Sequence, residues 1–279
     1  MVTRVFALFS ILAMIALSGC GDSTPPPSTG TTTGGAKTDA APKPKKSGGA
    51  AAYDPAKATG TIKGVASFDG AAPKPKEIDI SSSADCKAKH TEPMLKEEFA
   101  INAGKVQNVV VYVKSVDGAN PEDKWTFEAP SAKVTIDQAG CQYKPHVLAL
   151  QVDQALTITT SDDFPHNIHK LAGENAEFNE SQQKKGMTAE KKFSNPEYGD
   201  KVGKIVCNIH NWMSAYMHVF PHPFFAVTKE DGTFEIKVPA GKYEVVAWHE
   251  SDKVAVPAAQ TITVGDGESK DANFTFKAK

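Results

Sequence analysis

The sequence predicts an all-β protein with a sandwich architecture, and three observations support that prediction. Apolar and polar residues alternate with a two-residue period in many short segments, as in Thr233–Val238, whereas a helical period is scarce. Turn residues such as Asp231-Gly232 and Pro239-Ala240-Gly241 separate these segments. Many short strands joined by turns are typical of two packed β-sheets.

The alternating segments can be placed in order along the chain. Because only a short turn at Pro239 separates the segments 233–238 and 242–248, we expect these two segments to form a β-hairpin. The fold of the polar stretch 174–192 is not defined by this pattern. The expected strands are 60–68, 106–113, 132–136, 147–152, 155–160, 233–238, 242–248 and 261–264.

The first 19 residues have the features of a processing signal. Arg4 precedes a short apolar run that ends in Leu17-Ser18-Gly19-Cys20. This end resembles the lipobox of bacterial lipoproteins, which implies cleavage before Cys20 and a lipid on its sulfur. An ordinary secretory signal and an N-terminal membrane helix are the alternatives. The expected location is extracytoplasmic, lipid-anchored on the periplasmic side of a bacterial membrane. The outer membrane is slightly favoured, because Gly21 is not a retention signal of the aspartate kind.

Residues 20–59 are predicted to be a disordered tether. They are mostly Pro, Gly, Ser, Thr, Ala and Lys, and Tyr53 is their only aromatic residue. Such a segment buries too little apolar surface to offset the entropy lost on ordering. About 220 residues remain for one large domain or two small ones. The net charge of −2 and the scattered Lys and Arg residues give no support for nucleic-acid binding.

Two motifs indicate a metal site. One is Phe164-Pro165-His166-Asn167-Ile168-His169, and the other is Cys207-Asn208-Ile209-His210-Asn211-Trp212-Met213. One thiolate, two imidazoles and a weak axial thioether favour copper and suit one-electron transfer. The predicted ligands are therefore His166, Cys207, His210 and Met213, with Met217 as the alternative axial residue. The competing interpretation is a buried structural thiol beside a core methionine.

The segment from about 131 to 221 resembles a cupredoxin, the small Greek-key copper domain, and its motifs are most similar to amicyanin. The resemblance implies a type 1 copper at His166, Cys207, His210 and Met213, with Asn167 tying the two ligand loops together. His169 is then a surface or structural histidine. Two interpretations of the apolar side chains near His210 are equally open. They form a patch that binds redox partners, or they are ordinary core residues. These side chains are Phe164, Pro165, Trp212 and Met213.

The flanking segments 60–130 and 222–279 resemble a carboxypeptidase-regulatory or transthyretin-like sandwich. The similarity lies in Asp231-Gly232-Thr233-Phe234 and Pro239-Ala240-Gly241-Lys242-Tyr243, a common motif. The expected architecture is a cupredoxin domain combined with this second sandwich, either inserted in it or in tandem with it. His218, His222 and His249 have no assigned role and are expected at the surface.

The four cysteines can each be given one role. With Cys20 assigned to lipid and Cys207 to copper, Cys86 and Cys141 remain, and a pair in an exported protein is expected to form a disulfide. Two thiolates with His90 and His146 would instead make a zinc or second copper site.

The predicted function is that of a membrane-tethered blue copper protein that carries single electrons between extracytoplasmic redox partners. The alternative is a lipoprotein for copper handling or envelope structure without electron transfer. An enzyme is not expected, because the four ligand positions are filled and hydrolase motifs such as G-x-S-x-G are absent.

Overall fold

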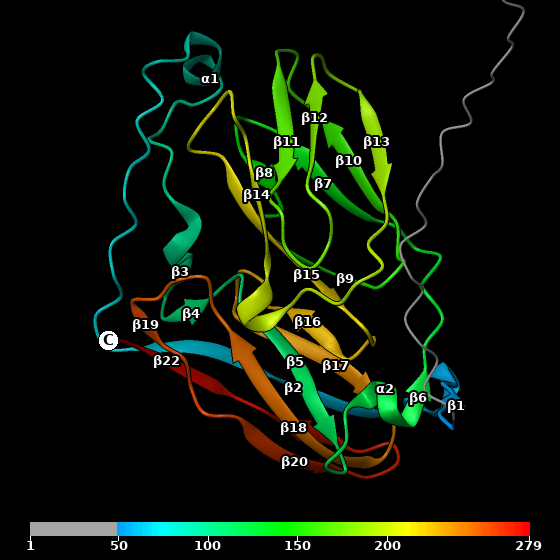
Figure 1. The fold of residues 1–279 in the computed structure, drawn as a ribbon. Helices are drawn as coiled ribbons and strands as arrows, with labels where there is room; N and C mark the ends of the chain where they lie inside the picture. The colour runs from blue at the N-terminus through cyan, green and yellow to red at the C-terminus, as the bar shows by residue number, and fades with distance from the viewer. Residues whose placement is uncertain (1–48) are drawn as a thin grey trace, which may run out of the picture. The chain divides into compact units, whose positions relative to one another are not determined.

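A computed structural model of the chain describes residues 49–279, so the predicted signal segment, Cys20 and most of the expected tether lie outside the described residues (Figure 1). The described part is almost entirely β-structure, as the alternation predicts. No helix within residues 49–279 is long and apolar enough to span a bilayer. The short helical elements are η1 (Pro55–Lys57), α1 (Ala84–Ala88), η2 (Glu97–Phe99), α2 (Pro121–Lys124) and η3 (Gly199–Lys201).

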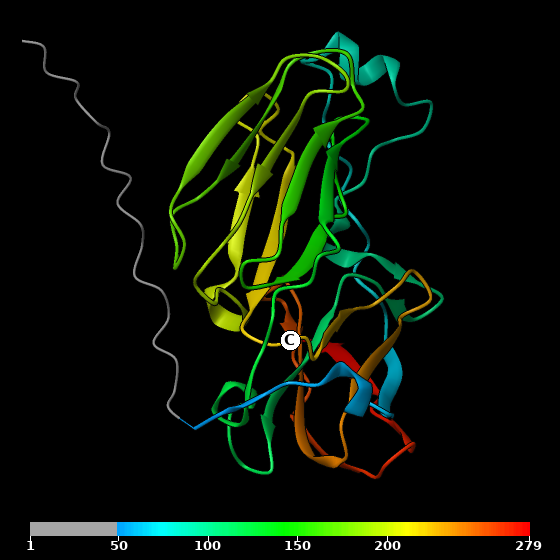
Figure 2. The ribbon, with the colours of Figure 1, turned by 90° about the vertical axis from the view of Figure 1, so that its right-hand side faces the viewer.

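The strands between residues 134 and 220 form two sheets that pair only among themselves, and Figure 2 shows them as two layers. One sheet has the order β13-β10-β7-β8 and the other β12-β11-β14-β15-β9. Buried side chains such as Ile136, Ile158 and Ile205 fill the space between them. The bounds are β7 (Val134–Gln138), β8 (Tyr143–Lys144), β9 (Val147–Gln151), β10 (Leu156–Thr160), β11 (His166–Lys170), β12 (Phe178–Gln182), β13 (Thr188–Lys191), β14 (Gly203–Val206) and β15 (Ser214–Phe220).

The strands on either side of this segment pair with one another. One sheet has the order β16-β5-β18-β20, and the other the order β19-β22-β2-β4-β3 with β17 and β21 also on β2. The chain therefore leaves this second sandwich, builds the first one and returns. The bounds are β2 (Gly60–Asp69), β3 (Ile101–Asn102), β4 (Lys105–Val106), β5 (Val110–Val116), β16 (Phe225–Val227), β17 (Thr233–Val238), β18 (Gly241–Trp248), β19 (Val254–Ala255), β20 (Gln260–Val264), β21 (Ser269–Asp271) and β22 (Phe274–Ala278).

The predicted hairpin of the segments 233–238 and 242–248 is wrong. β17 pairs with β2, whereas β18 pairs with β5 and β20 in the opposite sheet. Both strands bury alternate side chains in the same core, among them Ile236 and Val245. The short turn at Pro239 therefore connects the two sheets. β17 and β18 lie in opposite sheets, and each buries its apolar face in the core between them.

The expected strand at 106–113 is split into β4 and β5. Asn108 has a φ of 65°, a left-handed conformation that interrupts the extended backbone. The side chain of Thr228 accepts a hydrogen bond from the N–H of Val109 next to this break.

The end of the predicted tether is ordered, and in this respect the boundary at residue 59 is wrong. β1 (Ala51–Ala52) pairs with β6 (Trp125–Thr126), and the N–H of Tyr53 donates to Thr126. The ring of Tyr53 packs against Trp125, Phe127 and Phe224 at centroid distances of 5.0 to 6.0 Å. The single aromatic residue of the polar segment thus supplies the apolar contact that orders its last residues.

A long connection between β2 and β3 reaches the first sandwich. We call residues 70–96 the strap; Figure 1 shows it in cyan, running from β2 to α1 and back. Cys86 and Met94 are its only buried residues. A disulfide joins Cys86 to Cys141 in the turn between β7 and β8.

Candidate metal centre

Three of the predicted ligands lie together at one end of the first sandwich. His166 opens β11 directly after Pro165, and Cys207 directly follows β14. These two strands are paired, with His169 opposite Val206, so the two ligand segments are neighbours. His210 lies on the loop from β14 to β15.

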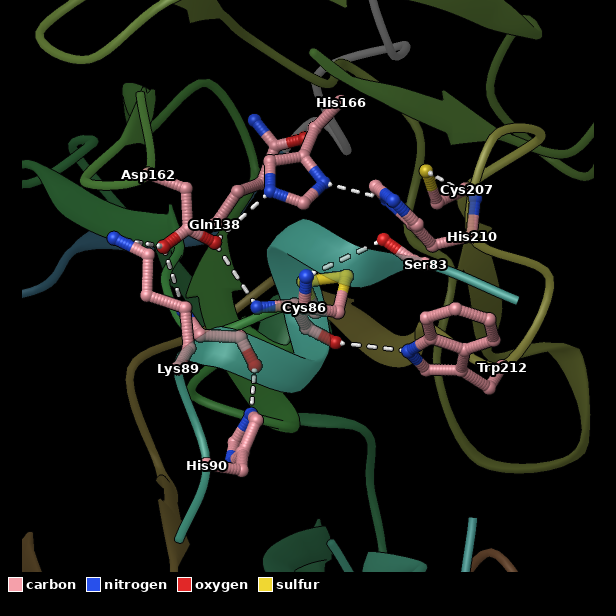
Figure 3. The surroundings of a disulfide bond; sticks show 12 residues. Ser83, Cys86, Lys89, His90, Gln138, Asp162, His166, Cys207, His210 and Trp212 are labelled. Atoms are coloured by element: carbon pink, nitrogen blue, oxygen red, sulfur yellow. Dashed lines mark hydrogen bonds and ion pairs between the residues drawn. A yellow bond between two sulfur atoms is a disulfide. The ribbon is translucent and has the colours of Figure 1, made fainter. Parts of the chain in front are cut away.

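The ligand atoms of His166, Cys207 and His210 lie within 4.8 Å of one another, and all three residues are buried. The Nδ1 atoms of the two imidazoles face each other at 3.0 Å (Figure 3). A thiol and two imidazole nitrogens around one small space are a donor set that suits copper.

Backbone hydrogen bonds close the loop that carries Cys207, His210 and Met213. The N–H of Cys207 donates to the carbonyl of Met213 at 3.2 Å, and the N–H of Met213 donates to the carbonyl of His210 at 2.9 Å. The N–H of His210 donates to the sulfur of Cys207 at 3.3 Å. The short spacing therefore gives a compact turn that holds its side chains at one place.

The two candidate axial methionines occupy different positions. Met213 is buried on the ligand loop itself. Met217 lies in β15 opposite Gly203, four residues before Cys207 on the neighbouring strand. At about 3.3 Å per residue, that register places the backbone of Met217 about 13 Å along the strand from Cys207.

Asn167 contacts both ligand segments. Its side-chain oxygen accepts hydrogen bonds from the N–H groups of Asn208 at 2.8 Å and Ile209 at 3.3 Å, and it lies 3.3 Å from the sulfur of Cys207. Its amide nitrogen donates to the side chains of Asn179 and Asn208. The β11 segment is thereby tied to the loop that follows β14.

Asp162 is a contact of the site that the sequence analysis did not identify. Its carboxylate accepts a hydrogen bond from Nε2 of His166 at 2.9 Å and from the N–H groups of Gly140 and Cys141 at 3.0 and 2.9 Å. A carboxylate on the outer nitrogen orients an imidazole and leaves Nδ1 free to bind a metal. The acidic residue lies four positions before His166, and this spacing in the sequence could have identified the contact.

The surroundings also change the ionisation of the ligands. Burial raises the pKa of the Cys207 thiol, but hydrogen bonds from His166 and backbone groups outweigh it and hold the pKa below its usual value. Burial lowers the pKa of His166, but contacts with Cys207 and Asp162 leave it raised. Burial and the nearby His166 lower the pKa of His210. The site therefore favours the thiolate, the form of cysteine that binds metals.

The disulfide lies against the side chain of the candidate ligand His210. Both sulfurs lie within 4.8 Å of a ring nitrogen of His210, which is 7% exposed. Trp212 is half-buried and donates from Nε1 to the carbonyl of Cys141 at 3.3 Å, and Met213 is buried in the core. Of the four side chains considered for an open apolar patch, Pro165 is exposed, Phe164 and Trp212 are half-buried, and Met213 is buried.

The histidines of the alternative second metal site are bonded to other groups and are not grouped with the two cysteine sulfurs. Nε2 of His90 is bonded to the carbonyl of Gly140 at 2.8 Å. His146 contacts the carbonyl of Ser214 and a carboxylate oxygen of Glu250 at 2.6 Å. The ring of His169 is bonded to Asn208 and Glu177 and is not grouped with the candidate metal ligands.

The expectation that His218, His222 and His249 lie at the surface is wrong. Their exposed fractions are 0%, 1% and 8%. His218 is stacked on Phe220 and meets the ring of Trp248 at 4.5 Å, where aromatic residues of the two sandwiches pack together. Each of these histidines also contacts an aromatic ring from a distant segment, so its burial cannot be deduced from local sequence alone.

Comparisons with known proteins identify structural neighbours but no family. No protein-family model matches the chain, and no curated protein matches it. A copper-containing nitrite reductase from Thermus scotoductus is 19% identical over 37% of this chain and 24% of its own, with a TM-score of 0.30. This chain thus spans about a quarter of that protein.

Two smaller proteins are matched over most of their own length. A purple cupredoxin from Nitrosopumilus maritimus is 25% identical over 31% of this chain and 98% of its own, with a TM-score of 0.26. A reduced amicyanin variant is 23% identical over 33% and 86%, with a TM-score of 0.28. The structural neighbours of this chain are cupredoxins, and the similarity covers about a third of it.

Proposed function

We propose that this chain is a type 1 copper protein that carries single electrons between extracytoplasmic redox partners while a lipid on Cys20 holds it at a membrane. The observation that carries the proposal is the buried grouping of His166, Cys207 and His210, with two imidazole nitrogens facing each other at 3.0 Å. Copper bound by one thiolate and two imidazoles supplies one-electron oxidation and reduction.

The residues around this grouping fit such a centre. Asp162 orients His166 through Nε2, so its Nδ1 is directed toward the other ligands. Asn167 fixes the loop of Cys207, and the lowered pKa of the thiol favours its metal-binding form. These contacts hold the donor atoms in place before a metal arrives, which keeps the rearrangement on electron transfer small.

We assign the axial position to Met213 rather than Met217. Met213 belongs to the closed loop of Cys207 and His210, whereas the register of β15 carries Met217 away from Cys207. A long, weak axial thioether completes the type 1 donor set.

The burial of the site supports electron transfer over catalysis. All three clustered ligands are nearly inaccessible, and the strap and its disulfide lie against His210. A metal with four protein ligands and no solvent-facing position has no place for a substrate. Electrons can nevertheless pass through the packed side chains.

Copper handling is the second candidate function, and one observation favours it. The Cys86–Cys141 pair lies beside a candidate copper ligand, where its sulfurs could take part in copper exchange after reduction.

Voltammetry of the copper-loaded full chain, with a Cu(I) chelator in solution, separates these functions. A carrier should show a reversible one-electron wave that persists over repeated cycles, because copper stays bound in both states. Loss of the wave as the chelator removes Cu(I) would contradict electron transfer and favour copper handling.

A further inference from the structure

The disulfide and a candidate copper ligand form a second grouping of metal-binding atoms. The sulfurs of Cys86 and Cys141 and a ring nitrogen of His210 lie within 4.8 Å of one another, and all three residues are buried (Figure 3). Neither His90 nor His146, the histidines that the cysteine spacing suggests, belongs to this grouping. The histidine grouped with both sulfurs comes instead from the loop that follows β14.

Contacts other than the sulfur–sulfur bond hold Cys141 in position. Its N–H donates to Asp162 at 2.9 Å, and its carbonyl accepts from Nε1 of Trp212 at 3.3 Å. The preceding Gly140 is bonded to both Asp162 and His90. Breaking the disulfide therefore leaves Cys141 beside His210.

Cys86 is held by the strap. It lies in α1, where its N–H is bonded to the side chain of Ser83, and Lys89 and His90 link the same turn to Asp162 and Gly140. The strap has only two buried residues, so it can open locally at low cost in free energy and admit a small reductant. On closing, its remaining contacts return Cys86 to the same place.

We propose that reduction of the Cys86–Cys141 disulfide creates a Cu(I) site formed by these two sulfurs and His210. A dithiol reductant supplies two electrons, the sulfur–sulfur bond breaks, two protons are taken up, and the reductant becomes a disulfide. Each thiol releases its proton when its sulfur binds Cu(I), and His210 donates a nitrogen lone pair. Two thiolates and one imidazole are soft donors that select Cu(I).

The proposed site shares His210 with the type 1 site but does not need Cys207. The inference therefore does not rest on electron transfer at the type 1 site and can be tested without it. The test uses the full chain with Cys20→Ser and Cys207→Ser, in which Cys86 and Cys141 are the only remaining cysteines. This chain is reduced with a dithiol, freed of reductant without oxygen, and titrated with Cu(I) against a chromophoric Cu(I) chelator.

The reduced chain should bind one Cu(I), and X-ray absorption should show two sulfur neighbours and one nitrogen neighbour. The oxidised chain, and a chain that also carries Cys86→Ser and Cys141→Ser, should bind none. Adding His210→Gln should remove the nitrogen neighbour and weaken binding by about tenfold or more. His169→Gln, on the neighbouring strand β11, is the matched control and should leave binding unchanged.

Three results would overturn the proposal. One is a disulfide that no dithiol reduces in the folded chain. Another is Cu(I) uptake that does not depend on reduction. The third is equal affinity with and without His210, which would show that the two cysteines bind copper without this histidine. Circular dichroism of the reduced chain shows whether they do so in a folded or an unfolded chain.

Discussion

Nε2 of His166 lies 2.9 Å from a carboxylate oxygen of Asp162, and that carboxylate also accepts hydrogen bonds from Gly140 and Cys141. Asp162 is thus the link between a candidate copper ligand and the turn that carries the disulfide. Its own pKa is lowered, because these donors outweigh the effect of burial. It stays ionised and keeps the imidazole of His166 in one tautomer.

Replacing Asp162 with Asn should weaken Cu(II) binding by about 10- to 100-fold, because an amide fixes the tautomer of His166 less strongly. Competition titration with a Cu(II) chelator measures the affinity. Asp163→Asn is the matched control, since that neighbouring carboxylate is 74% exposed and should have no effect. Equal affinities of the two variants would show that Asp162 does not orient the ligand.

Asn167→Ala should destabilise the ligand loop. The substitution leaves the N–H groups of Asn208 and Ile209 without their acceptor. A loss of about 1–3 kcal/mol in unfolding free energy is expected in urea denaturation. The copper-dependent absorption should also weaken as Cys207 shifts. A variant as stable and as strongly absorbing as the original chain would contradict a tie between the two ligand segments.

The buried ion pair of Lys170 and Glu197 should be sensitive to the loss of one partner. Their charged atoms lie 2.9 Å apart, with side-chain exposures of 0% and 1%. Lys170→Met should cost about 3–5 kcal/mol, because the carboxylate of Glu197 is left buried and uncompensated. Denaturant unfolding measures this loss.

The exposed pair of Lys114 and Glu244 is the control, and Lys114→Met should cost about 1 kcal/mol or less. A double change, Lys170→Met with Glu197→Leu, should recover much of the lost stability. If the single and double variants were equally unstable, packing rather than charge would explain the cost.

His218 should make the fold sensitive to acid. Burial lowers its pKa to about 3, and neither ring nitrogen has a hydrogen-bond partner in the described part of the chain. An unfolded chain binds a proton at this histidine below a pH of about 6.5, whereas the folded chain does not until about pH 3, so stability is lost as the pH falls through this range.

Between pH 7 and pH 5, this single histidine should cost about 2 kcal/mol of stability. His218→Phe removes the titrating group, so the variant should lose about 2 kcal/mol less than the original chain over the same interval. Urea unfolding at both pH values gives the difference. If both chains lost the same unfolding free energy between pH 7 and pH 5, His218 would not be held neutral in the folded protein.

The grouping of the candidate ligands could be predicted from the sequence, because their spacing along the chain is short. Cys207, His210 and Met213 lie on one loop, and Asn167 is adjacent to His166, so the local pattern places them almost by itself. The contact of Asp162 with His166 spans four residues and could have been predicted, whereas its contacts with Gly140 and Cys141 could not, because those residues belong to a distant turn.

The strands were largely predictable, but their pairing was not. Alternation shows which side chains face a core, as for Ile236 and Val245, and does not show which sheet they belong to. The hairpin failed for this reason, since β17 and β18 bury side chains in one core from opposite sheets. The position of the strap and the burial of His218 could not be predicted for the same reason, because both depend on contacts between distant segments.

The visible spectrum of the full chain during titration with Cu(II), beside a Cys207→Ser variant, tests the central claim most directly. A type 1 site predicts an intense blue absorption that saturates at one equivalent of copper and is absent from the variant. A colourless original chain, or a variant with the same spectrum, would contradict a copper centre at His166, Cys207, His210 and Met213.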